Sequence, residues 1–214
     1  MPAQPTECPP WEYMDFPDHD AILIARTSTL LVRLRSARLD THEVSTETRP
    51  YHGFLFEGLT PNSVPYYAGH YRGEALLCLR NYPVGIAGDP AVGSDPAYVS
   101  VEMSALVTEL SAALKALDAT HELPDAQHDP EDKLYYTVVV AARVLELFYR
   151  IHPYANGNGH IGRLIVWCIL GRYGYWPSQW PVHPRPGPPF IQRIAEYRAG
   201  NAHALEHYLM SNVA

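Results

Sequence analysis

The stretch DPEDKLYYTVVVAARVLELFYRIHPY, residues 129–154, constrains the fold more than any other part of the chain. Asp129 is suited to cap a helix, Pro130 fits a first helical turn, and the acidic residues that follow favour the positive end of the helix dipole. The middle of the stretch is almost continuously apolar, and Pro153 biases the residue before it away from helix. The pattern therefore predicts one long helix, buried on most sides, that ends at about His152.

Shorter patterns predict further helices around this one. Helical spacing of apolar residues, alanine content or a proline near the start indicates helices within 19–38, 49–58, 98–117 and 159–173, and two short helices after residue 189 that are broken at Gly200. Residues 1–18 and 177–189 are rich in proline and predict irregular structure. Two apolar runs around Asn81–Pro83 predict a β-hairpin within 68–88. The expected fold class is mostly α, with one small hairpin.

Composition excludes several classes of function. The formal net charge of −7 argues against a broad nucleic-acid-binding face, which needs clustered lysine and arginine. No apolar run reaches the ~18 residues that span a bilayer, and the first twenty residues lack the pattern of a signal peptide. We therefore expect no nucleic-acid or membrane partner and a cytoplasmic protein.

The three cysteines are odd in number and far apart in the sequence. Cys8, Cys78 and Cys168 show no CxxC spacing, so neither a disulfide framework nor a zinc site is indicated. Cys78 and Cys168 stand among apolar residues, which predicts buried thiols.

Residues 151–164, IHPYANGNGHIGRL, combine glycines with basic side chains at the start of a predicted helix. Gly157 and Gly159 permit backbone angles closed to other residues, so successive N–H groups there can form an anion-binding nest at the positive end of the helix. Arg163 is disfavoured near that end unless an anion is present, and His160 lies close enough to share it. His152, across the loop, suits a general base. A plain turn is the simpler alternative, and two histidines without a nearby carboxylate disfavour a metal site.

The segment HPYANGNGHIGR resembles the signature of the Fic/Doc (Fido) family, which reads His, often Pro, Phe, any residue, Asp or Glu, Gly-Asn-Gly, Arg, two residues and Arg. Three further segments resemble parts of the family and follow in the family's order. The family's earlier helix and its lead into a flap resemble YHGFLFEGLTPNSVPYYAGHYRG (51–73), and the helix before the signature resembles LELFYRIHPY. The family's closing helices resemble AEYRAGNAHALEHYL. The similarity extends over about residues 45–212.

The resemblance implies a helical bundle with a β-hairpin flap, here a Fic-like domain at 46–214 after an N-terminal extension with one helix at 1–45. It also implies transfer of a nucleoside monophosphate, usually AMP from ATP, to a protein hydroxyl. By position, His152 would be the base, and Arg163 would hold the distal phosphate. The anion hole would comprise Gly157, Asn158 and Gly159, with His160 beside it. The target protein would dock along the flap, 76–88, by β-strand addition.

Two signature positions differ from the family's pattern. Asn156 stands where an acidic residue ligates Mg²⁺, so we expect weakened affinity for the metal. His160 stands where the first arginine contacts phosphate, and it is shorter and only partly protonated at neutral pH. Tyr154 replaces phenylalanine, a conservative change if its hydroxyl has a partner.

Three interpretations follow from these departures: an active transferase with altered donor or metal preference, a degraded enzyme that acts as a binding or regulatory module, or a helical protein with an anion-binding turn and no relation to transfer. The resemblance also suggests a small inhibitory partner, as in toxin–antitoxin relatives. An effector injected into a host cell is an alternative to a cytoplasmic protein.

Overall fold

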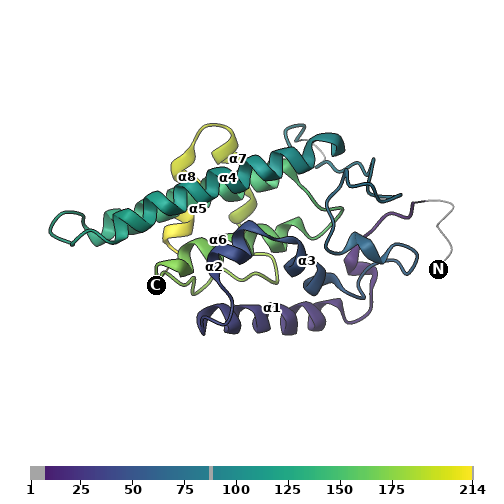
Figure 1. The fold of residues 1–214 in the computed structure, drawn as a ribbon, viewed down its shortest axis with the longest axis horizontal. Helices are drawn as coiled ribbons and strands as arrows, with labels where there is room; N and C mark the ends of the chain where they lie inside the picture. The colour runs from purple at the N-terminus through teal and green to yellow at the C-terminus, as the bar shows by residue number, and fades with distance from the viewer. Residues whose placement is uncertain (1–7, 87–88, 214) are drawn as a thin grey trace.

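The computed structural model describes residues 8–86 and 89–213. Within these residues the fold is mostly helical, as predicted (Figure 1). Its α-helices are α1 (His19–Arg35), α2 (Thr41–Thr46), α3 (Arg49–Phe56), α4 (Pro96–His121), α5 (Pro130–Ile151), α6 (Asn158–Arg172), α7 (Phe190–Arg198) and α8 (Ala202–Met210). Two short 3-10 helices lie at Tyr13–Asp15 and Pro65–Tyr67. The predicted helices are confirmed, including the break between α7 and α8.

Helix α5 occupies the centre of the bundle and begins and ends as the sequence predicts. The Asp129 carboxylate caps it by accepting from the Glu131 N–H at 2.8 Å. Along its length α5 packs against α4, α6, α7 and α8. Its last helical residue is Ile151, so His152 starts the loop that leads into α6. His152 therefore follows directly on a helix that four neighbouring helices hold in place.

Helix α6 is buried almost all round. Side chains on every face of Ile161–Gly171 are buried, because α5 covers one side while α2 and α1 cover others. In Figure 1, α1 lies along one edge of the molecule and α4 along the opposite edge, with α6 between them. The loop with the glycines thus joins the two most central helices of the fold.

The N-terminal extension packs into the same core as the rest of the chain. Leu23, Leu30 and Leu34 of α1 are buried in the single hydrophobic cluster that includes α5 and α6. The prediction of one helix in residues 1–45 needs correction, because α2 begins at Thr41. The Asp40 carboxylate caps it by accepting from the Glu43 N–H at 2.8 Å, and packing against α6 and α4 stabilises this short helix.

A disulfide joins Cys8 to Cys78, so the prediction of a buried Cys78 thiol is wrong. The two residues are 70 apart in the sequence but their Cα atoms are 5.2 Å apart. Packing of Trp11 against α3 brings the N-terminal segment to Cys78, and sequence spacing carries no trace of that contact. Cys168 is a buried free thiol, as predicted.

The predicted β-hairpin at 68–88 is not found in the part of it that the structure describes. The segment folds into turns, and an isolated antiparallel bridge joins Ile86 to Asp89; residues 87–88 lie outside the described residues. The Gly73 N–H donates to the Leu79 carbonyl at 2.8 Å, and the Tyr82 carbonyl accepts from the Arg72 side chain at 3.1 Å. These bonds use backbone groups that a strand ladder would need.

Among the described helices, α4 is the one that passes for a membrane span by length and mean hydropathy, which reaches 1.2. A core helix of a soluble domain passes the same test. Helix α4 packs against α5 and α2. Its buried side chains recur at helical spacing: Val99, Met103, Leu106, Leu110, Leu114 and Leu117. Helix α4 therefore covers the core with one face, and most of its other side chains are at least partly exposed.

Candidate active site

His152 lies at the C-terminal end of α5 in the left-handed backbone region, with φ 53° and ψ 61°. Its Nδ1 lies 3.1 Å from the Tyr149 carbonyl, which can only accept, so Nδ1 carries the proton and Nε2 has a free lone pair. Burial lowers the pKa of His152 to about 4, and the charges of Arg72 and Arg198 act in the same direction. The imidazole is therefore neutral at pH 7 and suited to accept a proton.

Arg72 holds the backbone around His152. Its guanidinium is fully buried and donates to the carbonyls of His152 at 2.8 Å and Ile151 at 3.0 Å. It also donates to the carbonyls of Tyr82 and Ser94, at 3.1 and 3.0 Å. One side chain thus satisfies carbonyl oxygens at the end of α5 and in the segment that passes beside it, and so supports the left-handed conformation of His152.

Two side chains, Asn158 within the segment and His52 of α3, fix the shape of residues 153–158. The Asn158 amide accepts from the Tyr154 N–H at 2.9 Å and donates to the Tyr154 carbonyl at 2.8 Å. His52 donates from Nε2 to the Asn156 carbonyl at 3.0 Å, because its Nδ1 accepts from the Gly69 N–H at 2.9 Å. Burial lowers the pKa of His52 to about 3, which keeps it in this neutral form.

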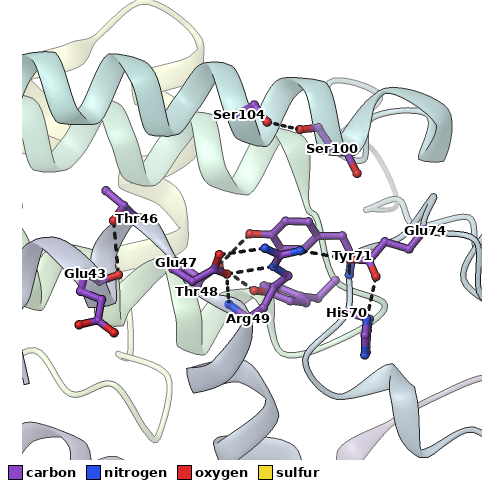
Figure 2. A network of polar contacts seen from close by, with 11 residues as sticks. Glu43, Thr46, Glu47, Thr48, Arg49, His70, Tyr71, Glu74, Ser100 and Ser104 are labelled. Atoms are coloured by element: carbon purple, nitrogen blue, oxygen red, sulfur yellow. Dashed lines mark hydrogen bonds and ion pairs between the residues drawn. The ribbon is translucent and has the colours of Figure 1, made fainter.

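The hydroxyl of Tyr154, which replaces the signature phenylalanine, has a buried partner. Its ring stacks on His52 with centroids 3.7 Å apart, and its hydroxyl is hydrogen-bonded to Thr48 Oγ1 at 2.7 Å. Thr48 also contacts the Tyr71 hydroxyl at 3.2 Å, and the Arg49 guanidinium lies over the Tyr71 ring (Figure 2). The loop is anchored to the start of α3 through this network.

The two glycines of the signature lie where an added side chain would have little room. Gly157 has φ +77°, and a Cβ atom there would lie 2.3 Å from the Phe56 ring. A Cβ atom on Gly159 would lie 3.1 Å from Arg163 Nη1. Helix α6 has no side-chain cap, and the N–H groups of Asn158 and Gly159 have no hydrogen-bond partner among the described residues. These two N–H groups can donate to an anion at the positive end of the helix.

His152, Gly159 and Arg163 line one cavity of about 460 Å³, a volume ordinary for small-molecule sites, which range from about 300 to 1,000 Å³. The other walls come from α5, α7, the loop before α7 and the segment near residue 86: Tyr149, Phe190, Ile191, Ile194, Ala195, Arg198, Arg185, Ile86 and Asp89. Three arginines face one aspartate in this cavity, so it is positively charged within a chain of net charge −7.

Arg163 is a buried cation without a carboxylate partner in the part of the chain that the structure describes. Its Nε donates to the Val182 carbonyl at 2.9 Å, and it is 2 % exposed. Burial lowers its pKa, and the nearby charge of Arg185 lowers it further. Burying a charge without a counter-ion is unfavourable, so this position favours binding of an anion from the cavity.

His160 does not line the cavity. Its Nε2 lies 2.9 Å from His183 Nδ1, and His183 Nε2 lies 3.1 Å from an Asp20 carboxylate oxygen. The carboxylate accepts from His183, so His160 donates to His183. Burial and the charge of Arg163 hold the pKa of His160 well below its usual value. A neutral imidazole whose N–H is already bonded is a poor ligand for phosphate.

The Asn156 side chain is also occupied within the chain. Its Oδ1 accepts from the Gly157 N–H at 2.6 Å, and its Nδ2 donates to the Trp11 carbonyl at 2.8 Å and to Glu12 Oε2 at 2.9 Å. The described residues contain no cluster of three or more histidine, cysteine, aspartate or glutamate side chains that could hold a metal ion. In this arrangement Asn156 does not fit the predicted role of a Mg²⁺ ligand, and we assign no step to a metal held there.

Several residues of the cavity and its support were not predicted as functional. Arg72 stands in the segment AGHYRG, but its contacts with the end of α5 are visible only in three dimensions. Arg185 lies in the proline-rich loop. Arg198 lies on α7 and forms ion pairs with Glu146 of α5 and with Asp89. Arg72 and Arg198 stand in the two segments, 51–73 and AEYRAGNAHALEHYL, that resemble the family, but the resemblance was not used to give either a role, and the sequence around Arg185 contains no such motif.

Comparison with known proteins bears on the part of the site that lies between residues 51 and 170. A sequence profile of the Fic/DOC family matches residues 51–170, more than half of the chain, and spans every residue from His52 to Arg163. A search among curated proteins gave no match. The profile match contradicts the interpretation as an unrelated helical protein with an anion-binding turn.

Proposed function

Because the chain belongs to the Fic/DOC family, we propose that it is a protein nucleotidyltransferase of the AMPylation type. It transfers a nucleoside monophosphate from a nucleoside triphosphate, with ATP as the first candidate, to a serine, threonine or tyrosine hydroxyl of a target protein. One observation carries the proposal: a neutral imidazole with a free Nε2 and an unpaired buried guanidinium open into the same cavity.

In the proposed reaction the target hydroxyl oxygen attacks the α-phosphorus of the donor. A new P–O bond forms, the bond from the α-phosphorus to the bridging oxygen of the β-phosphate breaks, and pyrophosphate leaves. The hydroxyl proton moves to Nε2 of His152, and the Tyr149 carbonyl stabilises the imidazolium through Nδ1–H. The negative charge of the bound donor raises the pKa of His152 from its resting value near 4, so the base strengthens when the donor is bound.

The donor phosphates are held by the start of α6. The free N–H group of Gly159, which lines the cavity, donates to a phosphate oxygen, and Arg163 binds the phosphates that leave. Gly157 contributes by permitting the close approach of the loop to Phe56 rather than by contact with the donor. Positioning and charge stabilisation supply most of the catalysis that such a transfer needs.

The target segment docks at the rim of the cavity formed by Ile86 and Asp89, within and next to the predicted flap at 76–88. Tyr82–Ile86 have no helical structure and contain Pro83, which removes one donor from this edge. We expect main-chain contacts with the target here, in the manner of strand addition.

A second candidate function is a catalytically degraded binding or regulatory module. The observation in its favour is that Asn156 and His160, the two positions that depart from the signature, both direct their polar atoms into the chain. Under this interpretation the cavity binds a nucleotide without transferring it. A small inhibitory partner of either form, and the cellular location, remain predictions.

Label transfer distinguishes the two functions. The protein is incubated with each α-phosphate-labelled nucleoside triphosphate, Mg²⁺ or Mn²⁺ and cell lysate, beside a His152→Ala control. A labelled protein band that disappears with the control supports the transferase and identifies its donor. Nucleotide binding without label, at concentrations where an intact relative labels readily, supports the binding module.

A further inference from the structure

Two of the three arginines that line the cavity, Arg185 and Arg198, lie outside the family signature. Arg185 lies in the loop between α6 and α7, lines the same cavity as His152 and Arg163, and is exposed. In the described part of the chain its side chain makes no ion pair or hydrogen bond, whereas Arg198 is paired with Asp89 and Glu146. Among the described residues, two positive charges of the cavity, at Arg163 and Arg185, therefore have no carboxylate partner.

The loop that carries Arg185 is fixed to α6. Arg163 Nε donates to the Val182 carbonyl at 2.9 Å, and Trp167 Nε1 donates to the Trp180 carbonyl at 2.8 Å. The side chains of Trp180 and Val182 are almost fully buried. The loop backbone is thus bonded to α6 at Trp180 and Val182, just before Arg185, and the Arg185 side chain is unbonded among the described residues.

These observations give Arg185 a role that His160 does not fill. His160, at the signature's first arginine position, is neutral and bonded to His183, so the expected second cation is missing from the motif itself. We propose that Arg185 binds the β- and γ-phosphates of the donor together with Arg163. This inference rests on the proposed function and adds a specificity: the cavity distinguishes nucleoside triphosphates from monophosphates through a residue of the proline-rich loop.

Calorimetric titration of the full chain with ATP, AMP and inorganic tripolyphosphate tests the proposal. A charge-assisted phosphate contact corresponds to a change in affinity of roughly tenfold or more. We expect Arg185→Gln to lower the affinity for ATP and tripolyphosphate by that factor, and the affinity for AMP by less than about twofold. Arg185→Lys retains the charge without the planar fork and gives an intermediate loss.

Arg38→Gln is the matched control, because Arg38 is also exposed, makes no side-chain bond in the described residues and does not line the cavity. It should bind all three ligands like the unaltered chain. If Arg185→Gln binds ATP as well as this control does, the role of Arg185 is refuted while the proposed function stands. If Arg185→Gln weakens AMP as much as ATP, the assignment to the distal phosphates is wrong. If the unaltered chain binds none of the three, the proposed function itself fails.

Discussion

Replacing Gly157 by alanine tests whether the loop geometry described here is required. The added Cβ atom would lie 2.3 Å from Cε2 and 2.6 Å from Cζ of Phe56, and 3.0 Å from Nε2 of His52. Gly157 also has φ +77°, where a residue with a Cβ atom is strained. The substitution therefore combines a backbone penalty with a steric one.

A second glycine separates these two penalties. Gly58 has nearly the same backbone angle, φ +74°, but a Cβ atom there would meet nothing within 4 Å. Gly58→Ala should lower the free energy of unfolding by about 1–2 kcal/mol, the cost of the left-handed conformation alone. Gly157→Ala adds overpacking against a fully buried ring, about 1–3 kcal/mol more, so we expect about 2–5 kcal/mol in all.

Urea unfolding followed by circular dichroism, with the Cys8–Cys78 disulfide kept oxidised, measures both variants. The slope of the free energy of unfolding against urea concentration should be the same for all variants, so that differences between the midpoints report differences in stability. Phe56→Leu removes the two ring atoms nearest the new Cβ atom, and in a double-mutant cycle it should recover about 1 kcal/mol or more of the Gly157→Ala loss. Equal losses for the two glycine variants, or additivity with Phe56→Leu, would refute the close approach of the loop to α3.

Three further predictions concern the support of the site, its pH dependence and its metal preference. Arg72→Lys replaces four hydrogen bonds to carbonyls with at most two or three. We therefore expect urea unfolding to show a free energy of unfolding lower by about 2–3 kcal/mol, and we expect slower transfer. Wild-type values for both would contradict the anchoring role. His52 and His152 have folded-state pKa values of about 3 and 4, below the usual 6.5, so the unfolded chain takes up protons first as the pH falls. Their contribution to the free energy of unfolding should be constant above about pH 7 and fall below pH 6.5 by up to about 1.4 kcal/mol per pH unit for each histidine; a urea series from pH 8 to 4.5 that stays flat would contradict it. Asn156→Asp places a second carboxylate beside Glu12, to which the Asn156 amide donates at 2.9 Å. Mn²⁺ or Mg²⁺ should therefore raise the melting temperature of this variant but not that of the unaltered chain. Equal shifts for the two proteins would contradict this prediction.

The sequence predicted the parts of the fold that local pattern determines. Helix α5 has an almost continuously apolar middle, a capping aspartate and a proline just after its end, and its last residue, Ile151, lies one residue before the predicted end. The Gly-Asn-Gly run predicted a loop at the start of α6, and the position of His152 between the two helices followed from both. The positive backbone angle of Gly157 agrees with that prediction.

The parts that were missed depend on contacts between distant segments. The disulfide joins residues 70 apart, and the Arg72 side chain reaches carbonyl groups 79 and 80 residues later. Two apolar runs around Asn81–Pro83 predicted strands, but the backbone groups there bond to Arg72 and within turns instead. The hydrogen bond between His160 and His183 could not be predicted from the signature, because His183 belongs to a distant loop that is held in place by buried residues such as Trp180.

Parallel incubations with α-labelled and γ-labelled ATP test the central claim most directly, since they show which bond of the donor breaks. We predict that the α label becomes covalently attached to protein, that the γ label does not, and that His152→Ala abolishes the attachment while the variant still binds ATP. Attachment of the γ label would identify a phosphoryl rather than a nucleotidyl transfer. Attachment of the α label that persists in His152→Ala would show that His152 is not the base.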